Sequence, residues 1–230
     1  MDFSYLDKNV KEVRDLIEKA KVKASRSDDV LMLAAIKSGE VDEINYLHNN
    51  LGVNDVGENR VQQLLSRYDL LSKENLNIHF IGHLQTNKVK YIIDKVRMIH
   101  SLDSEKLAAE IDRQAKKTGV VMDVLVEINS GREENKDGVL PEDALSLCQS
   151  LSKYENVSLR GFMTMAPRCD TYEEYVGYFT EIRDLAMNIW QNALKKEGSP
   201  VLSMGMSESF EAAIECGSTV VRVGRTLFKK

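Results

Sequence analysis

The chain lacks any apolar segment long enough to cross a membrane. Across its 230 residues, no apolar run approaches the ~18 residues that a transmembrane helix needs. The N-terminal segment Met1–Lys8 also lacks the apolar core of a signal peptide. With a net charge of −5, the composition gives no case for nucleic acid or an anionic membrane surface as a partner. We therefore expect neither partner.

Cysteine and histidine are scarce and scattered. The three cysteines, Cys148, Cys169 and Cys216, form no Cys-x-x-Cys pair, which is typical of free thiols in a reducing cytoplasm. The four histidines show no ligand-like spacing, so no structural metal is expected. No Gly-x-Gly-x-x-Gly follows the first apolar segment, which argues against dinucleotide binding. No linker or repeat divides residues 1–230, so one domain is expected.

Short apolar segments alternate with amphipathic segments along most of the chain. This alternation predicts a parallel sheet covered by helices, and about eight strands indicate a (β/α)8 barrel, a TIM-like α/β fold. The expected strands are Val30–Ile36, Asp55–Gly57, Ile78–Gly82, Met98–Ser101, Met122–Ile128, Val157–Met163, Val201–Met204 and Val220–Val223. The expected helices are Val41–Asn49, Val61–Leu71, Lys88–Lys95, Glu105–Lys117, Pro141–Leu151, Tyr172–Lys195 and Glu208–Glu215.

An extra amphipathic helix is predicted ahead of the first strand. Its apolar residues recur at spacings of three and four: Leu6, Val10, Val13, Ile17 and Ala20. Only seven residues follow the last expected strand, which leaves no room for an eighth helix. We expect the N-terminal helix to cover the barrel face left open there. Further along the chain, Ser104 is the expected N-cap of one helix and Pro141 the first residue of another.

Two segments near the C-terminus each run from an apolar strand into a small polar turn. They are Leu202–Ser207 and Val220–Arg225. In a (β/α)8 barrel the loops after the last two strands commonly bind phosphate, and backbone N–H groups beside a hydroxyl suit that anion. Lys37 ends the first apolar segment at the same rim. A partly desolvated lysine beside a phosphate turn predicts a pocket for a phosphorylated aldehyde, held as an imine.

Most of the polar residues at the strand ends also have a purely structural interpretation. Lys37 could extend into solvent, and Ser207 could cap the helix that follows it. Asn59 could cap the helix after the second strand, and His83 could be an ordinary loop histidine.

Arg222 and one long loop stand apart from these residues. Alternation along Val220–Val223 points Arg222 into the barrel, where a guanidinium needs an acceptor. The polar segment Asn129–Gly138 is long for a connection between a strand and a helix. We interpret this segment first as a flexible polar loop and second as a lid.

Five motifs lie in order at the expected strand ends. They are Ala35-Ile36-Lys37, Gly57-Glu58-Asn59, His79-Phe80-Ile81-Gly82-His83-Leu84-Gln85-Thr86-Asn87-Lys88, Arg160-Gly161-Phe162-Met163-Thr164-Met165-Ala166-Pro167 and Leu202-Ser203-Met204-Gly205-Met206-Ser207. From about Val30 to Phe228 the chain resembles the pyridoxal phosphate homeostasis protein family. That family looks like the barrel domain of alanine racemase, the N-terminal domain, without the second domain.

The resemblance implies how pyridoxal 5′-phosphate (PLP) would be held. Lys37 would bind the cofactor as a Schiff base, and Ser207 with the backbone amides of Gly224 and Arg225 would bind its phosphate. The family usually has Thr where this chain has Arg225, so only the main chain of Arg225 is expected to contribute. A second departure, Ser38-Gly39-Glu40 in place of the usual Thr-Lys-Pro, alters the loop after the lysine.

The resemblance also places three residues around the cofactor ring and bears on the activity. Arg222 would face the pyridine nitrogen, while Asn59 and His83 would line the ring. A permanently charged guanidinium keeps that nitrogen unprotonated, which weakens the electron sink that most PLP chemistry uses. The related racemase takes its second base, a tyrosine, from a second domain that this chain lacks.

These points favour a PLP carrier for cofactor homeostasis over an enzyme. The protein would be cytoplasmic and monomeric, with no catalytic residues and no metal, and it would release PLP to PLP-dependent apoenzymes. Two other classes stay open. One is a monomeric PLP-dependent racemase or lyase, with water or His83 as the second acid–base group. The other is a phosphosugar aldolase or isomerase that uses Lys37 as its Schiff-base lysine.

Overall fold

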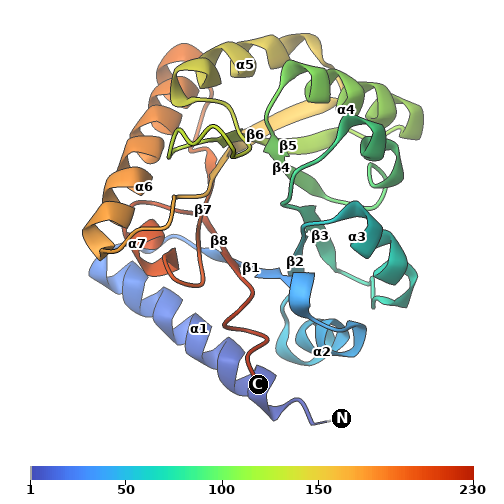
Figure 1. The fold of residues 1–230 in the computed structure, drawn as a ribbon, viewed down its shortest axis with the longest axis vertical. Coiled ribbons are helices and arrows are strands. Elements are labelled where there is room, and N and C mark those ends of the chain that lie inside the picture. Colours follow the sequence, from blue (N-terminus) through green and yellow to red (C-terminus); the bar gives the residue numbers. More distant parts are fainter. Residues whose placement is uncertain (1) are drawn as a thin grey trace.

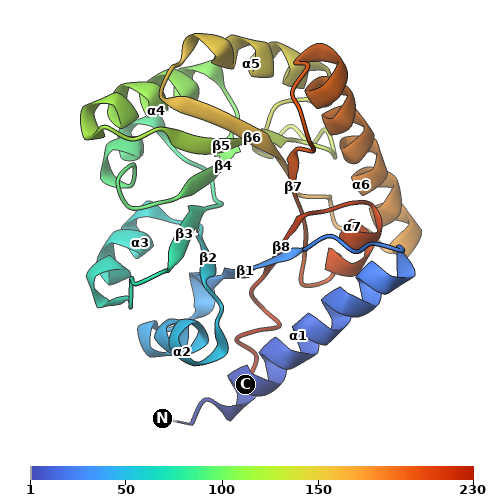
Figure 2. The same cartoon turned by 180° about the vertical axis from the view of Figure 1, so that it is seen from behind.

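The computed structural model describes residues 2–230 as a closed barrel of parallel strands (Figures 1 and 2). Neighbouring strands pair in chain order, and β8 closes the barrel by pairing with β1 from Leu31↔Val220 to Ala34↔Val223. The strands are β1 (Leu31–Ala35), β2 (Asp55–Glu58), β3 (Asn77–Phe80), β4 (Met98–Leu102), β5 (Met122–Ile128), β6 (Val157–Thr164), β7 (Val201–Met206) and β8 (Val220–Val223). The predicted (β/α)8 fold class is confirmed.

Helices surround the barrel on its outside (Figure 1). The α-helices are α1 (Ser4–Lys23), α2 (Val41–Leu51), α3 (Val61–Arg67), α4 (Glu105–Thr118), α5 (Ala144–Ser150), α6 (Tyr172–Met187) and α7 (Phe210–Glu215). Short 3-10 turns are η1 (Ile36–Ser38), η2 (Tyr68–Leu70), η3 (Thr86–Tyr91), η4 (Pro141–Asp143) and η5 (Leu151–Lys153), and η6 (Asn188–Ala193) is a π-helical turn. No helix in residues 2–230 has both the length and the hydropathy of a membrane span.

Helix α1 covers the barrel face between α7 and α2, as expected (Figures 1 and 2). Its predicted apolar stripe is buried, with Leu6 and Val13 fully inaccessible. The side-chain amide of Asn9 donates hydrogen bonds to the carbonyls of Leu227 and Lys229 at 2.9 and 2.8 Å. The helix therefore holds the C-terminal segment as well as the strands beside it.

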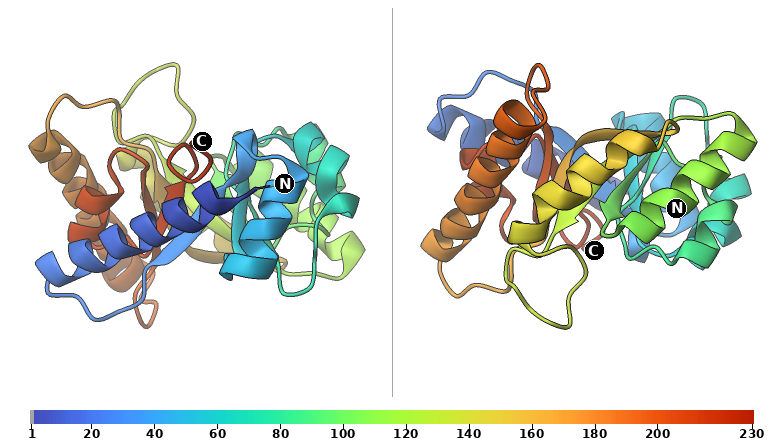
Figure 3. Two further views of the ribbon diagram at one scale, coloured as in Figure 1. Left: turned by 90° about the horizontal axis from the view of Figure 1, so that it is seen from below. Right: turned by 90° about the horizontal axis from the view of Figure 1, so that it is seen from above.

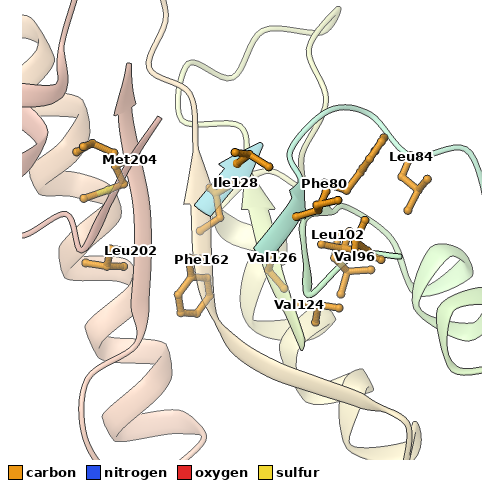
Figure 4. Close-up of a cluster of buried hydrophobic side chains, with 14 of the residues drawn as sticks. Phe80, Leu84, Val96, Leu102, Val124, Val126, Ile128, Phe162, Leu202 and Met204 are labelled. Atoms are coloured by element: carbon orange, nitrogen blue, oxygen red, sulfur yellow. The ribbon is translucent and has the colours of Figure 1, made fainter. Parts of the chain in front are cut away.

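The strands separate two sets of buried apolar side chains. Most of the core lies between the outer strand faces and the helices, and Figure 4 shows Val124, Val126, Phe162 and Leu202 within it. A smaller cluster centred on Leu33 lies on the inner strand faces. Because side chains alternate along a strand, the inner set also includes polar residues discussed below.

The structure differs from the sequence prediction mainly at helix ends. The expected helix Lys88–Lys95 is the 3-10 helix η3, and the expected Tyr172–Lys195 helix leaves α geometry after Met187. Short apolar spacings do not separate 3.0 from 3.6 residues per turn, which explains the error over η3. Ser104 is the N-cap of α4, as expected, since its hydroxyl accepts a hydrogen bond from Leu107 N. Pro141 begins the 3-10 turn η4 that leads into α5.

Candidate functional site

The predicted site residues all lie at the rim formed by the C-terminal ends of the strands. Each follows a strand or lies near its C-terminal end: Lys37 after β1, Asn59 after β2, His83 after β3, Ser207 after β7, Arg222 within β8, and Gly224 and Arg225 after β8. Figure 3 shows the loop between β5 and α5 projecting beyond this rim. This rim is where (β/α)8 proteins place their functional groups.

Close packing between β1 and β8 brings the turn after β8 next to Lys37. A Cβ atom on Gly224 would lie 2.7 Å from the carbonyl oxygen of Ala35, so only glycine allows this approach. Ala35 is the last residue of β1 and precedes Lys37 by two positions. The expected phosphate turn and the expected lysine are therefore neighbours in space, although they lie at opposite ends of the chain.

Lys37 itself is exposed, and the expectation of a partly desolvated lysine is wrong for this structure. The residue lies in η1, just beyond the strand, so the barrel wall does not cover its side chain. Its backbone is nevertheless firmly held. The carbonyl of Lys37 accepts a hydrogen bond from Gln63 Nε2 at 2.8 Å, and Arg67 Nη1 donates to the carbonyls of Ile36 and Gly39 at 3.0 and 3.2 Å.

A buried ion pair between Arg67 and Glu58 connects the Lys37 turn to the Asn59 turn. Arg67 Nη2 lies 2.7 Å from Glu58 Oε2, and both side chains are almost inaccessible. Glu58 Oε1 accepts hydrogen bonds from the backbone N–H groups of Asn59 and Arg60 at 2.7 and 3.2 Å. Burial raises the pKa of Glu58, and the charge of Arg67 opposes that shift. The capping interpretation of Asn59 is wrong, because Arg60 occupies the N-cap position and Glu58 binds the amides there.

The turns that carry Asn59 and His83 pack directly against each other. A Cβ atom on Gly82 would lie 2.2 Å from the carbonyl oxygen of Asn59, which brings the two backbones into contact. The Oδ1 atom of Asn59 is buried and has no hydrogen-bond partner within residues 2–230. A buried polar atom of this kind is costly unless a ligand or water satisfies it.

His83 is half-exposed and pairs with acidic residues from the segments that follow β4 and β5. Its Nδ1 atom lies 2.9 Å from Asp137 Oδ1 and 3.8 Å from Asp103 Oδ2. Asp137 belongs to the long loop after β5, so this contact ties the loop to the turn after β3. The three side chains have an arrangement that a metal ion could use, a cluster that sequence spacing did not reveal.

Arg222 points into the barrel, as alternation along β8 predicts. Its side chain is 4% exposed. Nη1 donates to the carbonyl and hydroxyl oxygens of Ser203 at 2.6 and 2.7 Å, and Nη2 donates to the carbonyl of Thr164 at 2.9 Å. Burial lowers the pKa of Arg222 to about 10, which still leaves the guanidinium charged at neutral pH. Its Nε–H makes no hydrogen bond to any residue from 2 to 230.

The turn after β7 presents two serines to the rim. Ser207 is half-buried in that turn and is not the N-cap of α7, since the helix begins at Phe210. Ser209 occupies the N-cap position, is buried, and accepts a hydrogen bond from Met206 N at 3.2 Å. The side chain of Arg225 forms an exposed ion pair with Glu208, with 3.0 Å between Nη2 and Oε1.

A cavity of about 470 Å³ opens beside these turns, between the ends of β5, β6 and β7. Ser209 and Arg225 line it, together with Glu127, Lys136 and Tyr175. Lys37, Asn59 and His83 lie on the other half of the rim, outside this lining. The structure thus places the predicted residues on one rim, with the open volume on the β5–β7 side.

Glu127 is an ionisable residue of the site that sequence reasoning missed. It lies on the inner face of β5, is 3% exposed, and its carboxylate has no hydrogen-bond or ion-pair partner within residues 2–230. Burial and the nearby charge of Asp137 together raise its pKa to about 8, and the charge of Arg222 opposes the shift. One signal was available: a single glutamate in the apolar segment Val124–Ile128.

Comparison with known proteins identifies the family over nearly the full length of the chain. The sequence profile described as alanine racemase, N-terminal domain, matches residues 2–230. A pyridoxal phosphate homeostasis protein of Aquifex aeolicus is 42% identical over 94% of each chain, and one of Helicobacter pylori is 36% identical over 93% of this chain and 94% of its own. The chain belongs to the pyridoxal phosphate homeostasis protein family.

Solved structures agree with the family assignment. A protein of Bifidobacterium adolescentis described as unknown has a TM-score of 0.90 at 31% identity and covers 99% of this chain and 97% of its own. PipY of Synechococcus elongatus, solved with PLP bound, has a TM-score of 0.80 at 30% identity and covers 93% and 99%. Alanine racemase of Clostridium difficile, at 19% identity and a TM-score of 0.76, shares the fold, and this chain matches 56% of its length.

Proposed function

We propose that this member of the pyridoxal phosphate homeostasis protein family binds PLP at the strand-end rim and holds it on Lys37. The observation that carries the proposal is the contact of Gly224 with Ala35, which puts the turn predicted to bind phosphate beside Lys37, the lysine that follows β1. Family membership supports it, as does the bound PLP of the related PipY.

The residues at the rim fit the cofactor. Asn59 offers a buried oxygen atom with no hydrogen-bond partner in residues 2–230, and the close approach of Gly224 to Ala35 keeps the turn after β8 beside Lys37. Ser207 and the backbone amides of Gly224 and Arg225 would hold the phosphate. Asn59 and His83 would line the ring, and the Nε–H of Arg222 would donate to the ring nitrogen.

Bound PLP supplies an aldehyde that a lysine amine can capture reversibly, with loss of water. The side chain of Lys37 is exposed at the rim, so it can reach an incoming aldehyde without displacing core residues. The backbone hydrogen bonds from Gln63 and Arg67 fix the turn from which Lys37 extends. Lys37 would thus provide the covalent attachment, and these backbone hydrogen bonds would position it.

We infer that the protein is a carrier of PLP and not a catalyst with turnover. The fully buried Arg222 keeps its proton at neutral pH, so the ring nitrogen that it faces would stay unprotonated. His83 could otherwise exchange protons with a substrate, but its Nδ1 atom is paired with Asp137. PLP-dependent apoenzymes would be the recipients, and the whole of residues 1–230 would act as one PLP-binding domain.

The three free cysteines support a reducing, cytoplasmic setting for this role. We also propose that the protein acts as a monomer. The large exposed apolar side chains are spread over several elements, among them Val22, Leu70 and Val121. Light scattering across a range of concentrations tests this point, and a concentration-independent dimer mass would contradict it.

One observation favours a second function, an amino-acid racemase or lyase. Tyr175 lines the 470 Å³ cavity, and its hydroxyl accepts a hydrogen bond from Cys169 N at 3.4 Å. A tyrosine at that place could act as a second acid–base group. Deuterium exchange at the α-carbon of amino acids distinguishes the functions: a carrier gives none above background, and a racemase gives steady exchange that Tyr175→Phe abolishes.

The direct test of carriage is a loading and transfer experiment. Cofactor-free protein is titrated with PLP, freed of excess ligand, and mixed with an apoenzyme whose activity reports PLP arrival. We expect a visible absorption band, lost on borohydride reduction, and activation of the apoenzyme by the unreduced protein only. A colourless protein after titration, or a band unaffected by borohydride, would contradict the proposal.

A further inference from the structure

A continuous chain of hydrogen-bonded polar side chains crosses the interior of the barrel. His79 Nε2 lies 3.1 Å from Asp55 Oδ1, and His79 Nδ1 lies 2.9 Å from His100 Nε2. His100 Nδ1 lies 3.0 Å from Ser203 Oγ, which in turn accepts the hydrogen bond from Arg222 Nη1. We call these five residues, Asp55, His79, His100, Ser203 and Arg222, the interior chain.

The interior chain connects the two ends of the barrel. Asp55 is the first residue of β2, so it lies at the N-terminal rim, where it lines a cavity of about 410 Å³ bordered by α1. His79 and His100 are buried on β3 and β4, and Arg222 lies towards the opposite rim. The interior of a (β/α)8 barrel is normally filled by branched apolar residues, so a polar chain there is a departure that requires a cause.

The donors and acceptors of the interior chain fit together in one order when Asp55 is ionised and both histidines are neutral. The carboxylate of Asp55 accepts, so His79 must carry its proton on Nε2 and accept at Nδ1. His100 must then donate from Nε2 and accept at Nδ1, so its acceptor faces the Ser203 hydroxyl. Ser203 donates to His100 and presents its lone pairs to Arg222.

Burial supports the neutral state of His100. The side chain is fully inaccessible, and desolvation, together with the electrostatic influence of the neighbouring His79 and the charge of Arg222, lowers the pKa of His100 well below the usual value for histidine. The charged ends of the interior chain are Asp55 and Arg222, and the buried carboxyl of Glu127, whose raised pKa favours its neutral form, lies near the Arg222 end. The chain therefore runs from a negative end to a positive end, with each hydrogen bond pointing the same way.

We propose that this ordered chain makes Asp55, His79, His100 and Ser203 positioning residues for Arg222. The Ser203 hydroxyl, locked as a donor to His100, offers Arg222 Nη1 an acceptor in a fixed direction, and this fixes the plane of the guanidinium. The remaining Nε–H then has one orientation available. The Nε–H can donate to the cofactor ring only if PLP binds at this rim, so this part of the inference rests on the proposed function.

The order of the chain is tested on cofactor-free protein by 15N NMR of the histidine side chains. We expect both His79 and His100 as Nε2–H tautomers. A His100 that carries its proton on Nδ1, or a His79 that carries two protons at neutral pH, would overturn the proposal. His48, whose Nε2 bonds the carbonyl of Glu74 outside the barrel, is an internal control. This measurement does not require PLP to bind.

The Asp55→Asn variant tests whether the terminal carboxylate sets the order. An amide can donate as well as accept, so the reversed order becomes accessible, and new Nδ1–H signals of His100 should appear while those of His48 stay in place. An unchanged His100 spectrum would overturn the proposal.

The link to Arg222 is tested on the loaded protein with Ser203→Ala and Ser203→Thr. Losing the hydroxyl acceptor should weaken PLP affinity about tenfold and shift the pH dependence of the visible band, and the threonine variant should restore both. Unchanged affinity and band in Ser203→Ala would overturn the positioning role. If the unaltered protein takes up no PLP, the proposed function fails, while the tautomer result still decides the order of the chain.

Discussion

Arg67 lies 2.7 Å from Glu58 and, with its other terminal nitrogen, holds the carbonyls on either side of Lys37. The pair lies outside the barrel lumen, between β2, α3 and the turn after β1. One buried ion pair thus fixes the turns that carry Lys37 and Asn59 at the same time. Neither Arg67 nor Glu58 faces the rim, so the ion pair acts by holding the turns of Lys37 and Asn59 in place.

Arg67→Ala should therefore damage both stability and cofactor binding. It leaves the Glu58 carboxylate buried without its partner, a change that costs about 3–5 kcal/mol of unfolding free energy. It also releases the Lys37 turn, so PLP affinity should fall in whatever protein stays folded. Urea denaturation and PLP titration measure the two effects. Arg113→Ala, which breaks an exposed pair with Glu110, is the matched control and should leave the unfolding free energy nearly unchanged. Equal effects of the two variants would contradict this role of Arg67.

Glu127 should make the cofactor-free protein less stable as the pH rises. Its pKa is about 8 in the folded state, against 4.5 for the free side chain, so between these values the folded state holds a proton that the unfolded state has lost. Stability from this group is complete below pH 4.5 and declines as the pH rises towards 8, by up to a few kcal/mol. Glu127→Gln removes the decline. The measurement is the difference in unfolding free energy between variant and parent at pH 5 and pH 8. A difference that does not grow with pH would contradict the assignment.

Ser207 and Arg222 should contribute to PLP binding in separable ways. Ser207→Ala removes one phosphate hydrogen bond, worth roughly 1.5–3 kcal/mol, and should weaken binding while leaving the spectrum of bound PLP unchanged. Arg222→Glu should protonate the ring nitrogen and shift the absorption band. Absorption spectra at matched occupancy compare the two, with Arg222→Lys as a variant that keeps the charge. Lower occupancy with identical spectra in both would show that this division is wrong.

Deleting residues 1–23 should leave an insoluble or molten protein. The deletion removes Leu6, Val10, Val13 and Ile17 from the core, each contributing roughly 1.5–3 kcal/mol. Together they rival the ~5–15 kcal/mol stability of a typical domain. The deletion retains every proposed PLP-binding residue, so the effect separates folding from binding. A soluble truncated protein with an unchanged melting temperature would contradict this account of α1.

The sequence predicted the barrel and most of its rim because both depend on local patterns. Alternation along Val220–Val223 was enough to point Arg222 inward, and the spacing of Leu6, Val10 and Val13 was enough to place α1 on the core. The partners of buried polar groups were not predictable in this way. The pairs of Arg67 with Glu58 and of His79 with His100 each join two elements, and neither residue of a pair carries a local signal for the other. The exposure of Lys37 likewise depends on a 3-10 turn whose geometry the apolar pattern does not encode.

The site of covalent attachment tests the central claim most directly. The protein is loaded with PLP, reduced with borohydride, digested and mapped by mass spectrometry, with Lys37→Ala treated in parallel. The account predicts one pyridoxyl adduct, on Lys37, and a folded Lys37→Ala variant that lacks both adduct and visible band. An adduct mainly on another lysine, such as Lys136 in the cavity lining, would contradict it.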